Sequence, residues 1–181
     1  MDLPVVELRR YTLEPGRRDE MIDAFERHLM ESQEEAGIMV LGTFRDLDRP
    51  DHFVWLRGFP DMESRRESLT AFYGGPVWKE YAPLVRPTML DTDDVHLLRP
   101  VGPGLSPGPL PPVDSPAPGG IVYVTFAPAP DPLATFVTEP AENTYPALPV
   151  HTGADVTVTL TRTPPPGDAA RLTPTARSPL R

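Results

Sequence analysis

The sequence predicts an α+β protein in which a β-α-β-β-α-β unit is followed by a smaller, β-rich unit. Within residues 1–99, segments that alternate as strands do are interleaved with segments of helical periodicity, in the order of a split βαβ motif. The composition then changes sharply. Residues 1–99 hold 7 prolines and 33 charged residues, whereas residues 100–181 hold 19 prolines and 10 charged residues. The two parts are therefore expected to be distinct structural units.

The first unit begins with a strand, a long helix and a second strand. Residues Val5 to Leu13 alternate well enough for a strand, and Pro15-Gly16 then turns the chain. Apolar residues at helical spacing predict a helix from about Arg17 to Ala36, and Gly37 is suited to the position just after its end. A second strand is expected from Ile38 to Phe44.

A hairpin, two short helices and a fourth strand complete this unit. The loop Asp46 to Asp51 leads into a third strand from His52 to Phe59. Asp61 is a candidate N-cap for a helix that runs to about Ala71. Pro76 can occupy the first turn of another short helix, which runs to about Val85, and the fourth strand is expected from Val95 to Arg99.

The second unit has weaker signals. Residues 100–120 are rich in Pro and Gly and are expected to form a semi-rigid linker. Strands are expected at Ile121–Ala127 and at Asp155–Arg162, the latter because Val and Leu alternate with Thr. A long ordered loop joins them, since residues 138–150 contain three prolines and no periodicity. Residues 163–181 offer few apolar anchors and are expected to be a flexible tail.

Two segments of the first unit resemble the NIPSNAP family. One reads Glu7-Leu8-Arg9-Arg10-Tyr11-Thr12-Leu13-Glu14-Pro15-Gly16, and the other, about 70 residues further on, reads Trp78-Lys79-Glu80-Tyr81-Ala82-Pro83-Leu84-Val85-Arg86-Pro87. The resemblance extends over roughly residues 3–162. It implies that residues 1–99 form a ferredoxin-like unit of a dimeric α+β barrel. It further implies that residues 121–162 are a degenerate second repeat, in which a loop replaces the first helix.

The strands of the first unit have two different faces. On the first strand, Val6 and Leu8 share one face, while Arg9 and Tyr11 share the other together with Glu7. The third strand repeats this division, with Trp55 on the aromatic and arginine-rich face. We expect the aliphatic face to lie under the helices and the other face to point toward the sheet that closes the barrel. Because the second unit is small, a second copy of the chain is expected to cover that face, which predicts a homodimer.

The aromatic and arginine-rich face supplies most of the candidate binding residues. It can line a polar-aromatic cavity inside the barrel, or it can be a buried subunit or repeat interface, where such residues are also enriched. Further candidates lie near the end of the last helical region, where an arginine followed by proline could bind a carboxylate bidentately. Those residues could instead cap the core and neutralise carbonyl groups at the helix end. The predicted binding residues are Arg9, Tyr11, Trp55, Trp78, Tyr81 and Arg86.

His28 is the candidate catalytic residue. It lies one turn beyond Phe25 on the long helix and borders the apolar face of that helix. There it could act as a general base or a haem ligand, or it could be a boundary histidine with no chemical role.

No metal site or cofactor is expected. His96 follows an acidic run, but that run lacks the glycine and the terminal glutamate of a calcium loop. His151 follows Glu139 and Glu142 in a loop of unknown geometry. The chain has no cysteine, so thiolate metal sites and a cysteine nucleophile are excluded. It also lacks the usual hydrolase, metalloprotease and phosphate-loop motifs.

The composition narrows the partners and the location. The net charge of −9 makes nucleic acid an improbable partner, because phosphate backbones repel an acidic surface. A hydrophobic fraction of 39% and a mean hydropathy of −0.29 are typical of globular proteins in water. No apolar run is long enough for a membrane span, and no signal peptide is evident. A bacterial cytoplasmic protein is expected.

Two classes of function remain open. The first is a small-molecule-binding barrel protein of bacterial metabolism that takes a small aromatic or acidic ligand. Through the barrel families related to NIPSNAP, the resemblance implies that the protein could be a cofactor-independent oxygenase or isomerase. The second is a non-catalytic scaffold or adaptor protein, as the resemblance also implies.

Overall fold

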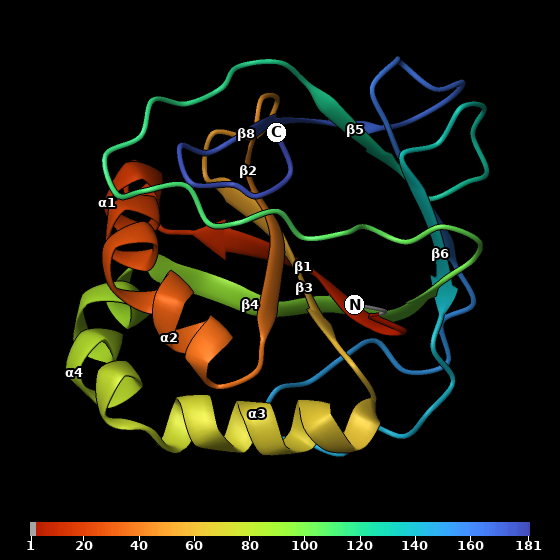
Figure 1. Ribbon diagram of the computed structural model, residues 1–181. Coiled ribbons are helices and arrows are strands. Elements are labelled where there is room, and N and C mark those ends of the chain that lie inside the picture. The colour runs from red at the N-terminus through yellow and green to blue at the C-terminus, as the bar shows by residue number, and fades with distance from the viewer. Residues whose placement is uncertain (1–2) are drawn as a thin grey trace.

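Eight strands close into a barrel within one chain. The computed structural model describes residues 3–181, and its strands follow one another around the barrel in the order β1-β3-β2-β8-β5-β7-β6-β4. Figure 1 shows the helices against one half of the barrel and loops around the other half. No helix in the described part of the chain is both long and apolar enough to cross a membrane.

The strands are β1 (Val5–Leu13), β2 (Met39–Asp46), β3 (His52–Phe59), β4 (Met89–Pro100), β5 (Val122–Thr125), β6 (Ala134–Thr138), β7 (Thr157–Thr161) and β8 (Ala170–Pro174). The helical segments are α1 (Arg18–Ala24), the π-helical η1 (Phe25–Leu29), α2 (Met30–Glu35), α3 (Met62–Gly74), α4 (Pro76–Val85) and the 3₁₀-helical η2 (Arg86–Thr88).

The first unit has the predicted element order, and the α+β class is confirmed. β1 and β3 have the predicted bounds. Asp61 caps α3 by accepting a hydrogen bond of 2.6 Å from the backbone N–H of Ser64. Pro76 is the first residue of α4, where its missing N–H costs no hydrogen bond. The long first helix is present, but its middle turn is π-helical, and β4 begins earlier than expected, at Met89.

The second half of the barrel repeats the strand order of the first half without its helices. In space the first unit reads β4-β1-β3-β2, and the second reads β8-β5-β7-β6, so each half places its strands in the order fourth, first, third, second. The halves join where the second strand of each pairs with the fourth strand of the other, β2 with β8 and β6 with β4. The second repeat therefore closes the barrel that the first repeat leaves open.

The predicted flexible tail is wrong. β8 lies within residues 163–181 and pairs with both β2 and β5. Leu172 is fully buried, and Thr175, Arg177 and Ser178, which follow β8, are buried as well. Arg177 bonds to the backbone carbonyl of Pro111 at 2.6 Å and to the carboxylate of Glu31. β8 and β6 escaped prediction because, unlike the equally short β7, neither shows a clear alternation of apolar and polar residues in its proline-rich surroundings.

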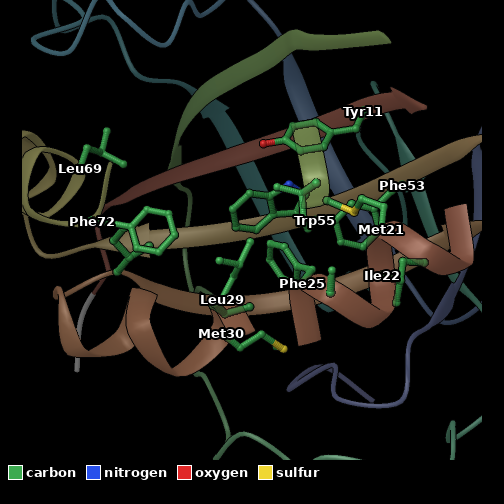
Figure 2. Close-up of a cluster of buried hydrophobic side chains, with 14 of the residues drawn as sticks. Tyr11, Met21, Ile22, Phe25, Leu29, Met30, Phe53, Trp55, Leu69 and Phe72 are labelled. Carbon is green, nitrogen blue, oxygen red and sulfur yellow. The ribbon is translucent and has the colours of Figure 1, made fainter. Parts of the chain in front are cut away.

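The predicted orientation of the two sheet faces is also wrong. Val6 and Leu8 belong to a mainly aliphatic cluster that takes residues from all eight strands, so this face points into the barrel. Tyr11 and Trp55 instead pack under the helices, against Phe25 and other apolar side chains (Figure 2). A closed eight-stranded barrel has an interior just wide enough for side chains to fill, which suits branched aliphatic residues. Two phenylalanines, Phe44 and Phe136, also lie inside, while the layer between sheet and helices holds most of the buried aromatic rings.

This orientation removes the premise of the homodimer prediction. The inner face of the first sheet is covered by β5 to β8 of the same chain, so a second copy is not needed to bury it. The homodimer itself stays a prediction.

A leucine pair tests whether β8 belongs to the folded barrel. Leu172→Ala should lower the free energy of unfolding by about 2–5 kcal/mol, because Leu172 is 0% exposed inside the barrel and its truncation leaves a cavity. Leu84→Ala is the matched control, since Leu84 on α4 is 51% exposed. Urea denaturation of both variants measures the difference. Equally small effects would show that β8 is not packed.

Candidate functional site

Four buried charged side chains meet between the sheet and α3. Glu7 and Arg9 are two residues apart on β1 and so point to the same face. Arg57 on β3 is the direct cross-strand partner of Glu7. Arg65 reaches the same point from α3, where it lies on the buried helix face with Leu69. The pleat, the strand register and the helix face together assemble the cluster.

The carboxylate of Glu7 is bonded to all three arginines. Its Oε2 atom accepts hydrogen bonds from Nη1 of Arg9 at 2.6 Å and from Nε of Arg57 at 2.7 Å. Its Oε1 atom accepts one from Nε of Arg65 at 2.7 Å. None of the four residues is more than 1% exposed. Three guanidinium groups against one carboxylate leave two net positive charges buried beneath the helices.

Polar side chains bind the outer atoms of these arginines. The hydroxyl oxygen of Tyr11 accepts from Nε of Arg9 at 3.2 Å, and that of Tyr73 accepts from Nη1 of Arg57 at 3.2 Å. Oδ1 of Asn143, in the loop between β6 and β7, accepts from Nη1 of Arg65 at 3.0 Å. Nη2 of Arg57 and Nη2 of Arg65 are buried and have no hydrogen-bond partner among residues 3–181. The cluster therefore keeps two buried N–H donor groups without a hydrogen bond.

The cluster fixes the protonation of its acid and of the neighbouring phenol. Burial by itself would raise the pKa of Glu7, but the combined attraction of Arg57, Arg9 and Arg65 outweighs burial and holds that pKa far below its ordinary value of 4.5. Burial raises the pKa of Tyr11. Glu7 is therefore ionised at neutral pH, whereas Tyr11 is a neutral phenol that can donate its proton in a hydrogen bond.

A cavity of about 270 Å³ opens beside Arg9. It carries two guanidinium groups and three aromatic rings, and its lining residues are Arg9, Tyr11, Tyr73, Trp78, Arg86, Met89, Leu90, Thr92 and Leu148. The guanidinium of exposed Arg86 lies 5.6 Å from the ring centroid of Trp78. A smaller cavity of about 20 Å³ shares Tyr11, Tyr73 and Trp78 with the first and reaches Trp55. This arrangement offers positive charge beside flat apolar walls.

The structure brings most of the predicted binding residues together. Arg9, Tyr11, Trp78 and Arg86 line the larger cavity, and Trp55 lines the adjoining one. They meet under the helices and not inside the barrel, as the reversed face assignment requires.

Tyr81 and the predicted catalytic residue His28 lie elsewhere. Neither lines the two cavities. Their rings stack on each other with centroids 3.9 Å apart and an angle of 5° between the planes. His28 is thus engaged by the face of Tyr81 and does not line either cavity.

Several site residues were missed by the sequence analysis. Arg65 stands next to exposed Arg66 and resembles a solvated helix position, although its spacing to Leu69 matches the buried face. Asn143 and Leu148 come from the loop that replaces a helix in the second repeat. No local sequence signal places that loop against α3, because the contact depends on barrel closure.

Comparison with known proteins assigns the family. The family model described as NIPSNAP matches residues 6–103, which is more than half of the chain. The chain belongs to the NIPSNAP family. This match covers β1 to β4 and all the helices of the NIPSNAP unit, whereas β5 to β8 lie outside it. The comparison with curated proteins gives no match.

Several solved structures are similar to part of the chain. An uncharacterized NIPSNAP-like domain protein from Burkholderia xenovorans is 27% identical, with a TM-score of 0.53 over 59% of this chain and 95% of that one. A nipsnap family protein with unknown function from Agrobacterium tumefaciens is 19% identical, with a TM-score of 0.50 over 55% of this chain and 89% of that one. A putative antibiotic biosynthesis monooxygenase from Chloroflexus aurantiacus is 22% identical, with a TM-score of 0.43 over 56% of this chain and 98% of that one.

The buried cluster makes a prediction about stability and pH. Glu7→Gln should lower the free energy of unfolding by about 3–5 kcal/mol at pH 7, because it leaves three buried guanidinium groups without their anion. Since the folded-state pKa of Glu7 lies below its ordinary value of 4.5, its contribution is present above that pH and is lost as the pH falls below it. The stability gap between wild type and variant should therefore shrink below about pH 4.5.

Glu20→Gln is the control, because exposed Glu20 pairs only with Arg17 at the start of α1. Urea denaturation at pH 7, 5 and 4 measures both variants. If Glu7→Gln were as mild as Glu20→Gln at pH 7, the cluster would not stabilise the fold.

Proposed function

We propose that this NIPSNAP protein binds a small organic anion with a planar apolar part, in the cavity between the sheet and the helices. The observation that carries the proposal is the lining of that cavity, where Arg9 and Arg86 stand beside Tyr11, Tyr73 and Trp78. Its volume of about 270 Å³ lies near the lower end of the range for small-molecule sites, which favours a ligand about the size of a substituted benzoate.

The two arginines have different tasks in this proposal. Arg9 is already bonded to Glu7 and Tyr11, so it supplies positive potential from the buried cluster. Arg86 is exposed and has no hydrogen bond to another described residue, which leaves its planar guanidinium able to bind a carboxylate bidentately. Trp78 and Tyr73 offer faces on which a delocalised ligand can stack.

The neutral phenol of Tyr11 extends the proposal toward catalysis. Its oxygen accepts from Arg9, so its own proton can point toward a ligand oxygen. A phenol beside a net positive cluster is suited to stabilise an enolate, which cofactor-independent oxygenation or isomerisation requires. The residues that line the larger cavity include no carboxylate and no histidine to act as the base. Ligand binding is therefore the better-supported function, and a cofactor-independent oxygenase or isomerase is the finer candidate.

Intrinsic fluorescence tests the binding proposal, because both tryptophans, Trp55 and Trp78, line the two cavities. Salicylate and benzoate should quench the fluorescence with saturation, and uncharged benzyl alcohol should not. Arg86→Ala should weaken binding by about 10- to 100-fold, the loss expected for a charge-assisted contact worth about 1.5–3 kcal/mol.

Arg66→Ala is the matched control, because Arg66 is an exposed arginine of α3 that pairs with Glu63 outside the cavity. It should bind as wild type does. Native purification followed by mass spectrometry should release a small acid from wild-type protein. If no acid is released and none of the probes binds, the scaffold or adaptor function takes the place of this proposal.

A further inference from the structure

Three side chains of the kind that bind metals converge at β4, on the strand face that it shares with Leu8 of the neighbouring β1. Asp94 and His96 are two residues apart on this strand, and His151 comes from the segment between β6 and β7. Each offers a ligand atom, and these atoms all lie within 4.8 Å of one another. The group stands apart from the anion cavity, since none of its members lines that cavity.

The backbone holds His151 in this place. Its N–H donates to the carbonyl oxygen of Val95 at 2.8 Å, so it bonds to the residue between Asp94 and His96. A second bond, from the N–H of Glu139 to the carbonyl of Leu97, fixes the start of the same segment along β4. The side chain of His151 is therefore set beside the other two by main-chain pairing.

The distances between these side chains are close to the distances between the ligand atoms of a bound zinc ion. Nε2 of His151 lies 2.8 Å from Oδ1 of Asp94, and the rings of His96 and His151 have centroids 4.3 Å apart at 31°. Ligand atoms around a tetrahedral zinc ion are roughly 3.4 Å apart, given bonds of about 2.0–2.1 Å. The three ligand atoms already lie within 4.8 Å of one another, and the partly exposed Asp94 and exposed His151 are the side chains with room to adjust.

The surroundings fit a site open to solvent on one side. His96 is 8% exposed and packs against Phe126, whereas the side chains of Asp94 and His151 are 35% and 45% exposed. An ion can enter from water, and a water molecule can complete its coordination. Arg10 contacts both carboxylate oxygens of Asp94, with Nε 3.0 Å from Oδ2 and Nη2 donating to Oδ1 at 3.1 Å, and so orients the carboxylate whose Oδ1 also faces His151.

We propose that Asp94, His96 and His151 bind a divalent transition metal, with zinc as the best match. Two imidazoles and one carboxylate form a donor set that suits zinc and its neighbours and not calcium or magnesium, which prefer oxygen ligands. The ion would join the loop of the second repeat to β4 of the first. This inference is independent of the anion site, and it involves a residue beyond the stretch that matches the family model.

Titration with Zn²⁺ and Co²⁺ tests the proposal on the full chain after dialysis against a chelator. Isothermal titration should show one equivalent of Zn²⁺, and Co²⁺ should give the visible absorption of a four-coordinate ion. Zn²⁺ should also raise the thermal midpoint in a concentration-dependent way. His151→Ala and Asp94→Asn should each weaken Zn²⁺ binding at least tenfold and abolish the thermal shift.

His52→Ala is the control, because His52 is a partly exposed histidine of β3 that contacts Thr12 and lies outside the group of three. It should bind Zn²⁺ as wild type does. His151 is exposed in a loop, so its variant should fold normally, as circular dichroism without metal can verify. The proposal is overturned if wild type binds neither ion, or if His151→Ala retains wild-type affinity.

Discussion

The pairing of β2 with β8 and of β6 with β4 is the constraint on which the other features depend. A four-stranded sheet has two edges with unpaired backbone groups and one face without helices. A second set of four strands closes the sheet, pairs the backbone groups of both edges and buries the face that has no helices. In doing so it creates a mainly aliphatic interior, shared by all eight strands.

The composition of that interior decides where the polar and aromatic residues go. Phe44 and Phe136 lie inside the barrel, whereas Tyr11, Trp55 and the guanidinium groups occupy the outer face, where the helices cover them. Glu7 then has to neutralise arginines that come from β1, β3 and α3. The candidate binding cavity lies beside this cluster and owes its positive potential to the excess of arginine over glutamate.

The second repeat contributes more than strands. Its loops, which stand where helices would be, reach back to the first repeat at two places. Asn143 and Leu148 complete the surroundings of Arg65 and of the anion cavity. His151 pairs with β4 and completes the proposed metal site. Both candidate sites therefore combine the NIPSNAP unit with residues outside the matched region, so neither can be understood from the family unit alone.

The sequence by itself determined the features that depend on local chemistry. The bounds of β1 and β3, the cap at Asp61 and the start of α4 at Pro76 follow from alternation, capping and proline geometry, which act over a few residues. It also separated the two faces of each strand. Only the tertiary structure decided which face is inside, because residues of both faces are buried and the choice depends on which of them the second set of strands covers. The same holds for β6 and β8, which become strands by pairing across the closed barrel. It also holds for the meeting of His96 with His151, 55 positions apart, which depends on the backbone bond from His151 to Val95.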